Sequence, residues 1–492
     1  MPGPADAERE LRHWHALAAL ALPGFSFALI NTLVAPALPE IQRELGVSAI
    51  SVGWVMTVQV LAAAVSTPIV GRLGDMHGKD RVLVAALAAC ALGSLLAAVS
   101  TSIEGLIAGR ALQGLAGATF PLAFGIVRDE FPPSQVGTGI GLASATWGLG
   151  GGVGLVIAGP LVNVNGYGSL FWFSFAAALV AVAVAWRYVP ASPVRVEARL
   201  DWLGAVLLAA GLGTLLLGVG HLGSRGPTAT ATAALLGGGA ALIAVWAIVE
   251  ARISEPLVEM RTMRSRPVLV VNLVGALTGV GMFATYLIVP QLVQAPASAG
   301  YGFAATVGEA GLFMLPSPML LLAGGPLAGV IGARRGFRSP LLAGLAICAA
   351  GLVWLAIAHR EPWHVYTATA LEGLGVGLAL AAMPNLIIES VDPDQTGVST
   401  GINAVMRMIG GSFGTQIVAA VLAGNLIAGT RIASEGAFVV ALAIAAAALA
   451  AAFLLALLVP RQGGREGATV LAHATAPAAT LAVRGRRGTT IR

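Results

Sequence analysis

Residues 437–459 read AFVVALAIAAAALAAAFLLALLV, a stretch without a charged side chain, a glycine or a proline. An α-helix rises about 1.5 Å per residue, so a helix of this length crosses the roughly 30 Å hydrocarbon core of a bilayer. Similar apolar runs occupy Val82–Val99 and Trp202–Val219. They lack the two-residue alternation of barrel strands, and only helices and closed barrels satisfy every backbone group in lipid. The runs therefore predict transmembrane α-helices.

The composition of the chain excludes an ordinary soluble protein. Hydrophobic residues make up 57% of the 492 residues and charged residues 10%, whereas a globular domain carries roughly 25% charged residues. So few charges cannot cover a surface that faces water. The 64 glycines suit a membrane bundle, because small residues let helix backbones approach closely in lipid. We expect an all-α membrane protein.

Apolar runs between polar breaks predict fourteen transmembrane helices. Their approximate ranges are 13–38, 51–73, 82–100, 104–127, 138–161, 168–188, 201–221, 229–250, 268–294, 305–331, 339–358, 364–388, 397–424 and 436–459. Residues 1–12 then form a cytoplasmic N-terminus and residues 461–492 a basic cytoplasmic tail. Residues 13–188 and 268–460 each hold six helices, and residues 189–267 hold an inserted helix pair with its connectors.

Basic residues predict the orientation of these helices. Of the 28 Lys and Arg residues, 22 fall on the side that holds both termini, 4 on the other side, and two, Arg110 and Arg407, inside helices. The positive-inside rule therefore places both termini in the cytoplasm. The net charge of +5 then needs no nucleic-acid partner. Arg outnumbers Lys 27 to 1, which indicates a GC-rich bacterial genome and hence the cytoplasmic (inner) membrane.

The chain repeats itself at a spacing of about 260 residues. PIVGRLGDMHG at 68–78 matches PLAGVIGARRG at 326–336, and PPSQVGTGIG at 132–141 matches DPDQTGVSTG at 392–401. Between these segments Cys90 falls on Cys348, Leu112 on Leu371 and Gly114 on Gly373. The first and last six helices are thus two pseudo-symmetric six-helix bundles that enter from the same side. Duplicated bundles of this kind are the architecture of alternating-access transporters, with the substrate site between the halves.

Three motifs resemble signatures of the major facilitator superfamily. GRLGDMHGKDR at 71–81 resembles its loop between helices 2 and 3, and Arg110-Ala-Leu-Gln113-Gly114 its R-x-x-Q-G motif in helix 4. The Gly-rich run Gly148–Gly159 is similar to its antiporter motif in helix 5. Fourteen helices with an inserted central pair resemble the drug:proton antiporter group of that superfamily. The resemblance implies a multidrug efflux transporter, usually a monomer.

The first signature suggests a gate at the cytoplasmic side, made by Gly71, Asp75, Gly78, Lys79 and Arg81. Its glycines allow a tight turn. Asp75 can accept hydrogen bonds from a helix N-terminus or from an Arg of the facing half. Such a contact would latch the cytoplasmic side shut in the outward-open state; the alternative is an ordinary loop carboxylate.

The other two signatures lie inside the predicted helices. A charge inside a span costs about 2.5–3.5 kcal/mol on insertion scales, so Arg110 is a candidate functional residue. The resemblance implies that Arg110, with Gln113, couples to proton movement; a static pair with a carbonyl or carboxylate is the alternative. In helix 5, Gly150, Gly151 and Gly154 serve either antiport or helix packing.

The sequence departs from the antiporter pattern where a proton carrier is needed. Ile30 stands at the usual helix 1 Asp position, and Gly154-Leu155 replaces Gly-Pro. Glu372, deep in a predicted helix, is our candidate for the coupling proton, because a carboxylate at that depth is protonated, paired or wetted. Glu309 is a second candidate or a helix cap. Arg407 either works with Glu372 or carries a charge for the substrate.

The sequence thus predicts a secondary active transporter that exports hydrophobic or amphipathic small molecules by alternating access, coupled to protons. The candidate cavity residues are Asn31, Trp147, Asn272, Met282, Tyr286, Asn403 and Met406. One alternative is a metabolite facilitator or symporter, and another is a membrane sensor or scaffold that transports nothing. No nucleophile–base pair, metal-ligand cluster or phosphate-binding loop is present in the sequence, so we expect no enzyme activity, metal or cofactor.

Overall fold

The computed structural model describes residues 4–131, 133–191, 200–226, 229–253, 256, 265–391 and 396–460. Within these residues the chain forms helices and no strand beyond one isolated bridge between Leu426 and Ala433. Thirteen of the described helices are long and apolar enough to cross a membrane. The prediction of an all-α membrane protein is therefore confirmed.

The first half of the chain contains eight α-helices and two 3-10 turns. They are α1 (Pro4–Leu33), η1 (Ala35–Ala37), α2 (Leu38–Leu45), α3 (Ala49–His77), α4 (Lys79–Val99), α5 (Ile103–Gly114), η2 (Leu115–Ala118), α6 (Thr119–Glu130), α7 (Pro133–Asn165) and α8 (Gly168–Tyr188). The inserted pair is α9 (Trp202–Arg225) and α10 (Thr230–Glu250). The second half contains α12 (Arg266–Val293), η3 (Ala297–Ala299), α13 (Val307–Met314), α14 (Pro316–Arg335), α15 (Arg338–Ile357), α16 (Pro362–Ile388), α17 (Thr396–Gly424) and α18 (Glu435–Ala456).

Three predicted helices are interrupted in the structure. The fourth predicted helix, over 104–127, is present as α5, η2 and α6, and neither α5 nor α6 is long enough to count among the thirteen spans. The first span bends at η1, which contains Pro36, and 305–331 divides into α13 and α14 before Pro316. Proline interrupts a helix because it lacks an N–H. Such breaks are tolerated at membrane depth where the freed backbone is buried in protein.

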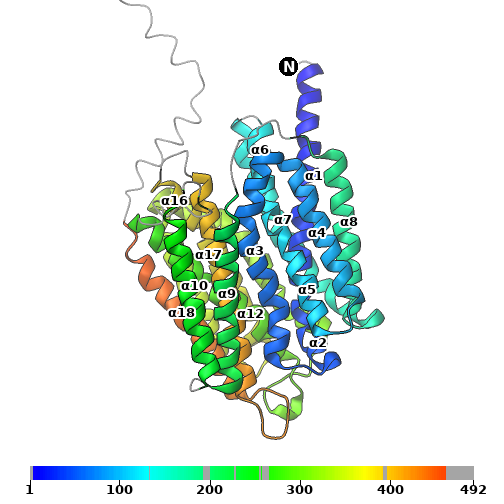
Figure 1. Cartoon of the computed structure of the whole chain (residues 1–492), viewed down its shortest axis with the longest axis vertical. Helices are drawn as coiled ribbons and strands as arrows, with labels where there is room; N and C mark the ends of the chain where they lie inside the picture. Colours follow the sequence, from blue (N-terminus) through cyan, green and yellow to red (C-terminus); the bar gives the residue numbers. More distant parts are fainter. Residues whose placement is uncertain are drawn as a thin grey trace, which may run out of the picture.

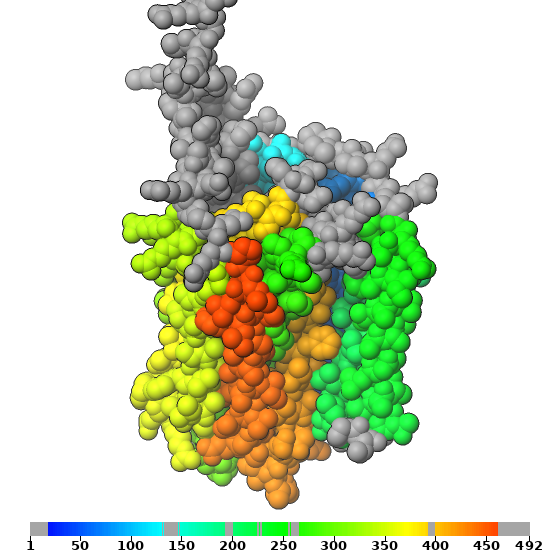
Figure 2. Space-filling view, turned by 90° about the vertical axis from the view of Figure 1, so that its left-hand side faces the viewer, coloured from blue at the N-terminus to red at the C-terminus, as the bar shows by residue number. Residues whose placement is uncertain are grey.

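The two halves meet along α3 and α17, and the inserted pair lies beside this contact (Figure 1). Helix α9 packs against both α17 and α3, and α10 packs on α9. The pair therefore forms one flank of the molecule, shown in green at the right of Figure 2. The N-terminus lies at the same end as the turn between α3 and α4, opposite α2 (Figure 1).

Glycines at matching positions pack each half in the same way. In the first half, a Cβ on Gly150 of α7 would lie 2.4 Å from the carbonyl oxygen of Phe25 in α1. In the second half, a Cβ on Gly410 of α17 would lie 1.8 Å from that of Ala276 in α12. Both distances are far shorter than real Cβ contacts, so neither position admits a side chain. The sequence repeat therefore corresponds to a repeated helix-packing interface.

The outer surface carries large apolar and aromatic side chains, as expected for contact with lipid. Trp186 and Tyr188 at the end of α8 are 78% and 59% exposed, and Trp202 at the start of α9 is 61% exposed. These three aromatic residues lie at one end of the bundle. At the other end Trp363, at the start of α16, is 55% exposed. Trp and Tyr at both ends are typical of the two membrane–water interfaces.

Candidate functional site

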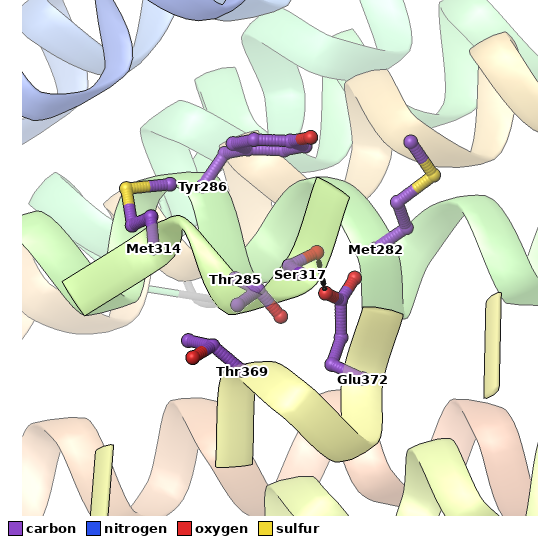
Figure 3. A pocket seen from close by; sticks show the side chains of 7 residues that line it. All are labelled: Met282, Thr285, Tyr286, Met314, Ser317, Thr369 and Glu372. Atoms are coloured by element: carbon purple, nitrogen blue, oxygen red, sulfur yellow. Dashed lines mark hydrogen bonds between the residues drawn. The ribbon is translucent and has the colours of Figure 1, made fainter. Parts of the chain in front are cut away.

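Two adjoining cavities share residues of α12; the first lies within the second half, and the other lies between the two halves. One is lined by Met282, Thr285, Tyr286, Met314, Ser317, Thr369 and Glu372 (Figure 3). The other is lined by Asn31, Thr32, Met56, Met282, Phe283 and Tyr286. They share Met282 and Tyr286 of α12, so both halves contribute to one site. Each cavity has a volume of about 10 Å³, far below the roughly 300–1,000 Å³ of ordinary ligand pockets. The site must therefore widen to hold a drug-sized molecule.

Glu372 is the acidic residue of this site. Its side chain is 3% exposed, and its Oε2 accepts a hydrogen bond of 2.5 Å from Ser317 Oγ, drawn as the dashed line in Figure 3. Among the described residues no Lys, Arg or His lies within ion-pair distance of its carboxylate. A buried carboxylate without a cation is stabilised by taking up a proton or by binding a positively charged group.

The break between α13 and α14 brings polar groups next to Glu372. Leu315 follows α13, and the sequence then runs Pro316-Ser317-Pro318. Because Pro316 and Pro318 lack an N–H, the backbone cannot make the full set of helical hydrogen bonds here. Met314 and Ser317 flank this break and both line the cavity. The break therefore places the Ser317 hydroxyl beside the carboxylate of Glu372.

Arg110 is fully buried behind the wall of the second cavity. Its Nε donates to the carbonyl oxygen of Val55 at 3.0 Å, and its Nη1 donates to that of Ile30 at 3.3 Å and to Gln113 Oε1 at 2.8 Å. Nη2 lies 3.6 Å from Met56 Sδ. No described carboxylate is within ion-pair distance of the guanidinium. Ile30, at the position where the resemblance leads one to expect an acid, contributes its backbone carbonyl oxygen to this cluster.

Gln113 extends this contact into a chain of hydrogen bonds. Its Nε2 donates to Ser94 Oγ at 2.8 Å, and Ser94 donates to the carbonyl oxygen of Cys90 at 2.8 Å. Arg110 and Gln113 therefore form one polar cluster that joins α1, α3, α4 and α5.

The loop signature forms a cluster of charges at the end of the bundle that holds the N-terminus. Lys79 Nζ lies 2.8 Å from Asp129 Oδ2 and 3.2 Å from Asp75 Oδ1, and the Lys79 side chain is 5% exposed. Asp129, in the last turn of α6, was not singled out from the sequence. Gly78 joins α3 directly to α4 with a φ of 104°, which explains the glycine there. Asp75 therefore pairs with its own loop, and Arg81 is exposed.

The glycines of α7 face two different neighbours. Cβ atoms on Gly150 and Gly154 would meet backbone oxygens of α1 at 2.4 and 2.7 Å, and the carbonyl oxygen of Gly151 accepts a hydrogen bond from Thr32 Oγ1 at 2.9 Å. These three residues pack within the first half. Gly159, by contrast, lies against Gly308 of α13, where a Cβ would be 2.2 Å from the Gly308 Cα. Helix α7 therefore holds α1 on one face and touches the other half on another.

Hydrogen bonds join the halves at the end opposite the N-terminus. Gln291 Nε2 donates to Gln42 Oε1 at 2.9 Å, and Gln294 Nε2 donates to the carbonyl oxygen of Pro36 at 2.6 Å. Arg431 Nη1 donates to the carbonyl oxygen of Gly46 at 2.8 Å. A further pair joins α3 to α17, where the hydroxyls of Thr57 and Thr415 are 2.7 Å apart. This end of the cavity is therefore closed by polar contacts between the halves.

Several residues singled out from the sequence lie away from the two cavities. Glu309 forms a capping box with Thr306 at the start of α13, as the cap alternative expects. Asn403 donates to Asn272 at 3.2 Å between α17 and α12, and neither residue lines a cavity.

Met406 and Arg407 of α17 are also outside the cavity linings. Met406 packs against Ala205 and Ile402, in contact with α9. Arg407 is half-buried. The side chain of Trp147 lies outside the described part of the structure.

The lining residues that the sequence had not singled out are Thr32, Met56, Phe283, Thr285, Met314, Ser317 and Thr369. The Pro-Ser-Pro run at 316–318 was the one signal that pointed to Ser317, because prolines mark breaks in membrane helices.

The fold and this central cavity define a membrane transporter, and comparison with known families agrees. The family model described as Major Facilitator Superfamily matches residues 20–415. The chain belongs to this superfamily and is a transporter, not an enzyme.

Its relatives include exporters of antibiotics. The chain is 28% identical to the tetracenomycin C resistance and export protein of Streptomyces glaucescens, over 84% of this chain and 77% of the relative. It is 27% identical to the probable actinorhodin transporter of Streptomyces coelicolor, over 89% and 80%. It is also 27% identical to the multidrug resistance protein B homolog of Mycobacterium tuberculosis, over 80% and 73%.

Solved structures share the fold at low identity. The transporter PepTSo of the POT family aligns with a TM-score of 0.66 at 15% identity, covering 91% of this chain and 97% of that one. The human organic anion transporter MFSD10 aligns with a TM-score of 0.59 at 15% identity, covering 90% and 99%. These likenesses bear on the fold alone.

Proposed function

We propose that this protein exports amphipathic small molecules from the cytoplasm by alternating access, driven by the proton gradient. The observation that carries the proposal is a pair of adjoining cavities, one within the second half and one between the halves, in which Glu372 is the one charged side chain among the described lining residues. Its other lining residues are methionines, aromatics and small polar residues, which suit a large apolar ligand with few polar groups. Relatives named as a resistance and export protein and as a multidrug resistance protein support the export of small molecules.

The conformation described here is closed towards the outside. The hydrogen bonds of Gln291, Gln294 and Arg431 hold the halves together at the end opposite the N-terminus. At the cytoplasmic end Asp75 pairs with Lys79 of its own loop, and among the described residues no ion pair joins it to the other half. We infer that the latch forms in the outward-open state, after the outer contacts have broken. The cycle then exchanges one set of contacts for the other.

Glu372 is the proposed carrier of the coupling proton. In the closed conformation it is buried, and no described cation offsets that burial, so the protonated form is favoured. Opening towards the cytoplasm wets the carboxyl and favours proton release. Arg110, held by backbone carbonyls and Gln113, keeps α1 and α3 in register with α5 during this movement.

The proposal includes the setting of the protein. We place it in the bacterial inner membrane as a monomer with both termini in the cytoplasm, since that orientation follows the distribution of basic residues. Residues 13–188 and 268–460 move as the two bundles, with 189–267 as the inserted pair, and 1–12 and 461–492 in the cytoplasm.

The test is transport in proteoliposomes with an imposed pH gradient. Glu372→Gln should abolish accumulation of a neutral fluorescent aromatic dye against its gradient, while downhill equilibration of the dye continues. Glu104→Gln is the matched control, because Glu104 is exposed in the first turn of α5. Accumulation by the Glu372→Gln protein at the wild-type rate would refute the role of this carboxyl.

The second candidate is a metabolite facilitator without proton coupling. Ile30 at the usual helix 1 acid position favours it. The same assay distinguishes the two, because a facilitator equilibrates the dye in both wild-type and variant proteins and never accumulates it.

A further inference from the structure

Arg407 is a half-buried cation of α17 that has no partner among the described residues. Helix α17 begins at the end of the bundle that holds the N-terminus (Figure 1), and Arg407 lies about 16 Å along it at 1.5 Å per residue. No described carboxylate is within ion-pair distance of the guanidinium, and no described group accepts a hydrogen bond from it. Arg407 and Glu372 therefore form no ion pair in this conformation, which favours a role for Arg407 towards the substrate.

The second arginine inside a helix shows what a structural role requires. Arg110 is fully buried and donates three hydrogen bonds to protein oxygens. Arg407 donates none to the described part of the protein and is partly accessible. Removing a guanidinium from water without giving it a partner is costly. Arg407 therefore keeps water around it until an anion replaces that water.

The backbone of Arg407 lies beside the wall of the second cavity. A Cβ on Gly279 of α12 would collide with the carbonyl oxygen of Arg407, and one on Gly411 of α17 would collide with the ring of Phe283. Phe283 lines the second cavity. Arg407 and Gly411 are four residues apart and share one face of α17. Arg407 therefore lies one helical turn from the cavity wall, on the side of the N-terminus.

Half-buried residues of α17 mark an opening that reaches Arg407. Thr400, Ala404 and Arg407 are half-buried, whereas Asn403 and Met408 are buried. Residues at spacings of four and three follow one stripe of a helix, and helical side chains lean towards the N-terminus of their helix. The guanidinium of Arg407 therefore points along this stripe towards the cytoplasmic end, where it borders a space that water reaches.

We propose that Arg407 binds the carboxylate of amphipathic molecules that enter this opening from the cytoplasm. The inference rests on the proposed transport function and names a substrate class for it. The guanidinium presents its N–H donors in a planar fork that matches a carboxylate with two parallel hydrogen bonds. The apolar part of the molecule then reaches Phe283 and Met282, which line the second cavity one turn away.

The experiment compares two fluorescent aromatic probes of nearly equal size, anthracene-9-carboxylate and the neutral anthracene-9-carboxamide. Binding to the purified full-length protein is measured without any gradient at neutral pH, where the carboxylate is ionised. The wild-type protein should bind the carboxylate at least about tenfold more tightly than the carboxamide, because a charge-assisted pair is strong in a poorly hydrated site. Equal binding of the two probes would overturn the inference.

Two variants test the assignment to Arg407. Arg407→Gln should remove the preference for the carboxylate, because glutamine forms hydrogen bonds but carries no charge. Arg252→Gln, at an exposed position after α10, is the matched control and should bind both probes as the wild-type protein does. An unchanged affinity for the carboxamide shows that each variant is folded. Retention of the preference in Arg407→Gln, or its loss in Arg252→Gln, would contradict the assignment.

A second measurement needs no variant. Phenylglyoxal modifies accessible arginines, and the mass spectra of peptides report how fast each arginine reacts. Anthracene-9-carboxylate should slow the modification of Arg407 and leave that of Arg252 unchanged, whereas the carboxamide should protect neither. Modification of Arg407 at one rate with and without the carboxylate would also overturn the inference.

These outcomes separate the inference from the proposed function. A protein that accumulates the neutral dye but binds both probes equally keeps the proposed function and loses the carboxylate site. A protein that binds the carboxylate through Arg407 but never accumulates any ligand keeps the site and loses the proton-driven export.

Discussion

Replacing Arg110 by methionine tests whether this arginine is needed for transport or for the stability of the fold. Arg110 makes three hydrogen bonds to oxygen, and its side chain is fully buried. Methionine has a similar length, carries no charge and removes all three hydrogen bonds. The two effects on stability have opposite signs.

The hydrogen bonds are worth about 0.6 kcal/mol each in membrane proteins, so their loss costs about 2 kcal/mol. Removing a charge from a membrane span stabilises the folded protein by about 2.5–3.5 kcal/mol on insertion scales. The amide of Gln113 loses its partner, which costs about 1–3 kcal/mol. These terms nearly cancel, so Arg110→Met should change the free energy of unfolding by less than about 2 kcal/mol.

Transport should nevertheless be lost if Arg110 acts in coupling. The assay pairs reversible unfolding in mixed micelles with dye accumulation in proteoliposomes. Arg252→Met, at an exposed position after α10, is the control and should alter neither measurement. Destabilisation by more than about 4 kcal/mol would exceed the sum of these contributions and would show that Arg110 is required for the stability of the fold. Normal accumulation would refute the coupling role.

Three further predictions concern packing, the outer contacts and the outer loop. Gly154→Val places atoms against α1 and should destabilise the protein by about 1–3 kcal/mol in micelle unfolding, whereas Gly213→Val, with open space around its Cβ position, should be nearly neutral. Gln291→Ala removes one contact between the halves, worth about 0.6 kcal/mol. The outer end should then open more often, and an external maleimide should label an Asn31→Cys reporter about threefold faster; an unchanged rate would contradict a closed outer end. Burial, with a smaller effect of Glu435, raises the pKa of Tyr301 to about 12. The neutral phenol therefore contributes fully to the free energy of unfolding below pH 10, and this contribution is lost between pH 10 and 12. Tyr301→Phe should remove this loss of stability when unfolding is measured over a series of pH values.

Hydropathy made the fold predictable from the sequence, because each helix in a bilayer is determined locally. A run such as Ala437–Val459 must satisfy its backbone internally wherever it lies. The repeat could also be read directly, since matching glycines recur at a fixed spacing. Breaks were harder to place: the span 104–127 divides at η2, although its one proline, Pro121, lies beyond η2 and inside α6.

The partners of the buried polar residues were not predictable in the same way. The sequence marked Arg110 and Glu372 as unusual for their depth, but not that Arg110 binds the carbonyl of Ile30 or that Glu372 binds Ser317. Asp129 was missed because a carboxylate at a helix end is common, and only the fold brings it to Lys79.

The sequence by itself determined that the chain crosses a membrane as two related helical bundles with an inserted pair. These properties depend on the number and order of apolar residues along the chain. The tertiary structure decided which polar side chains face the cavity and which face one another. That choice depends on the rotation and crossing of each helix, which packing between distant segments fixes and which no local pattern records.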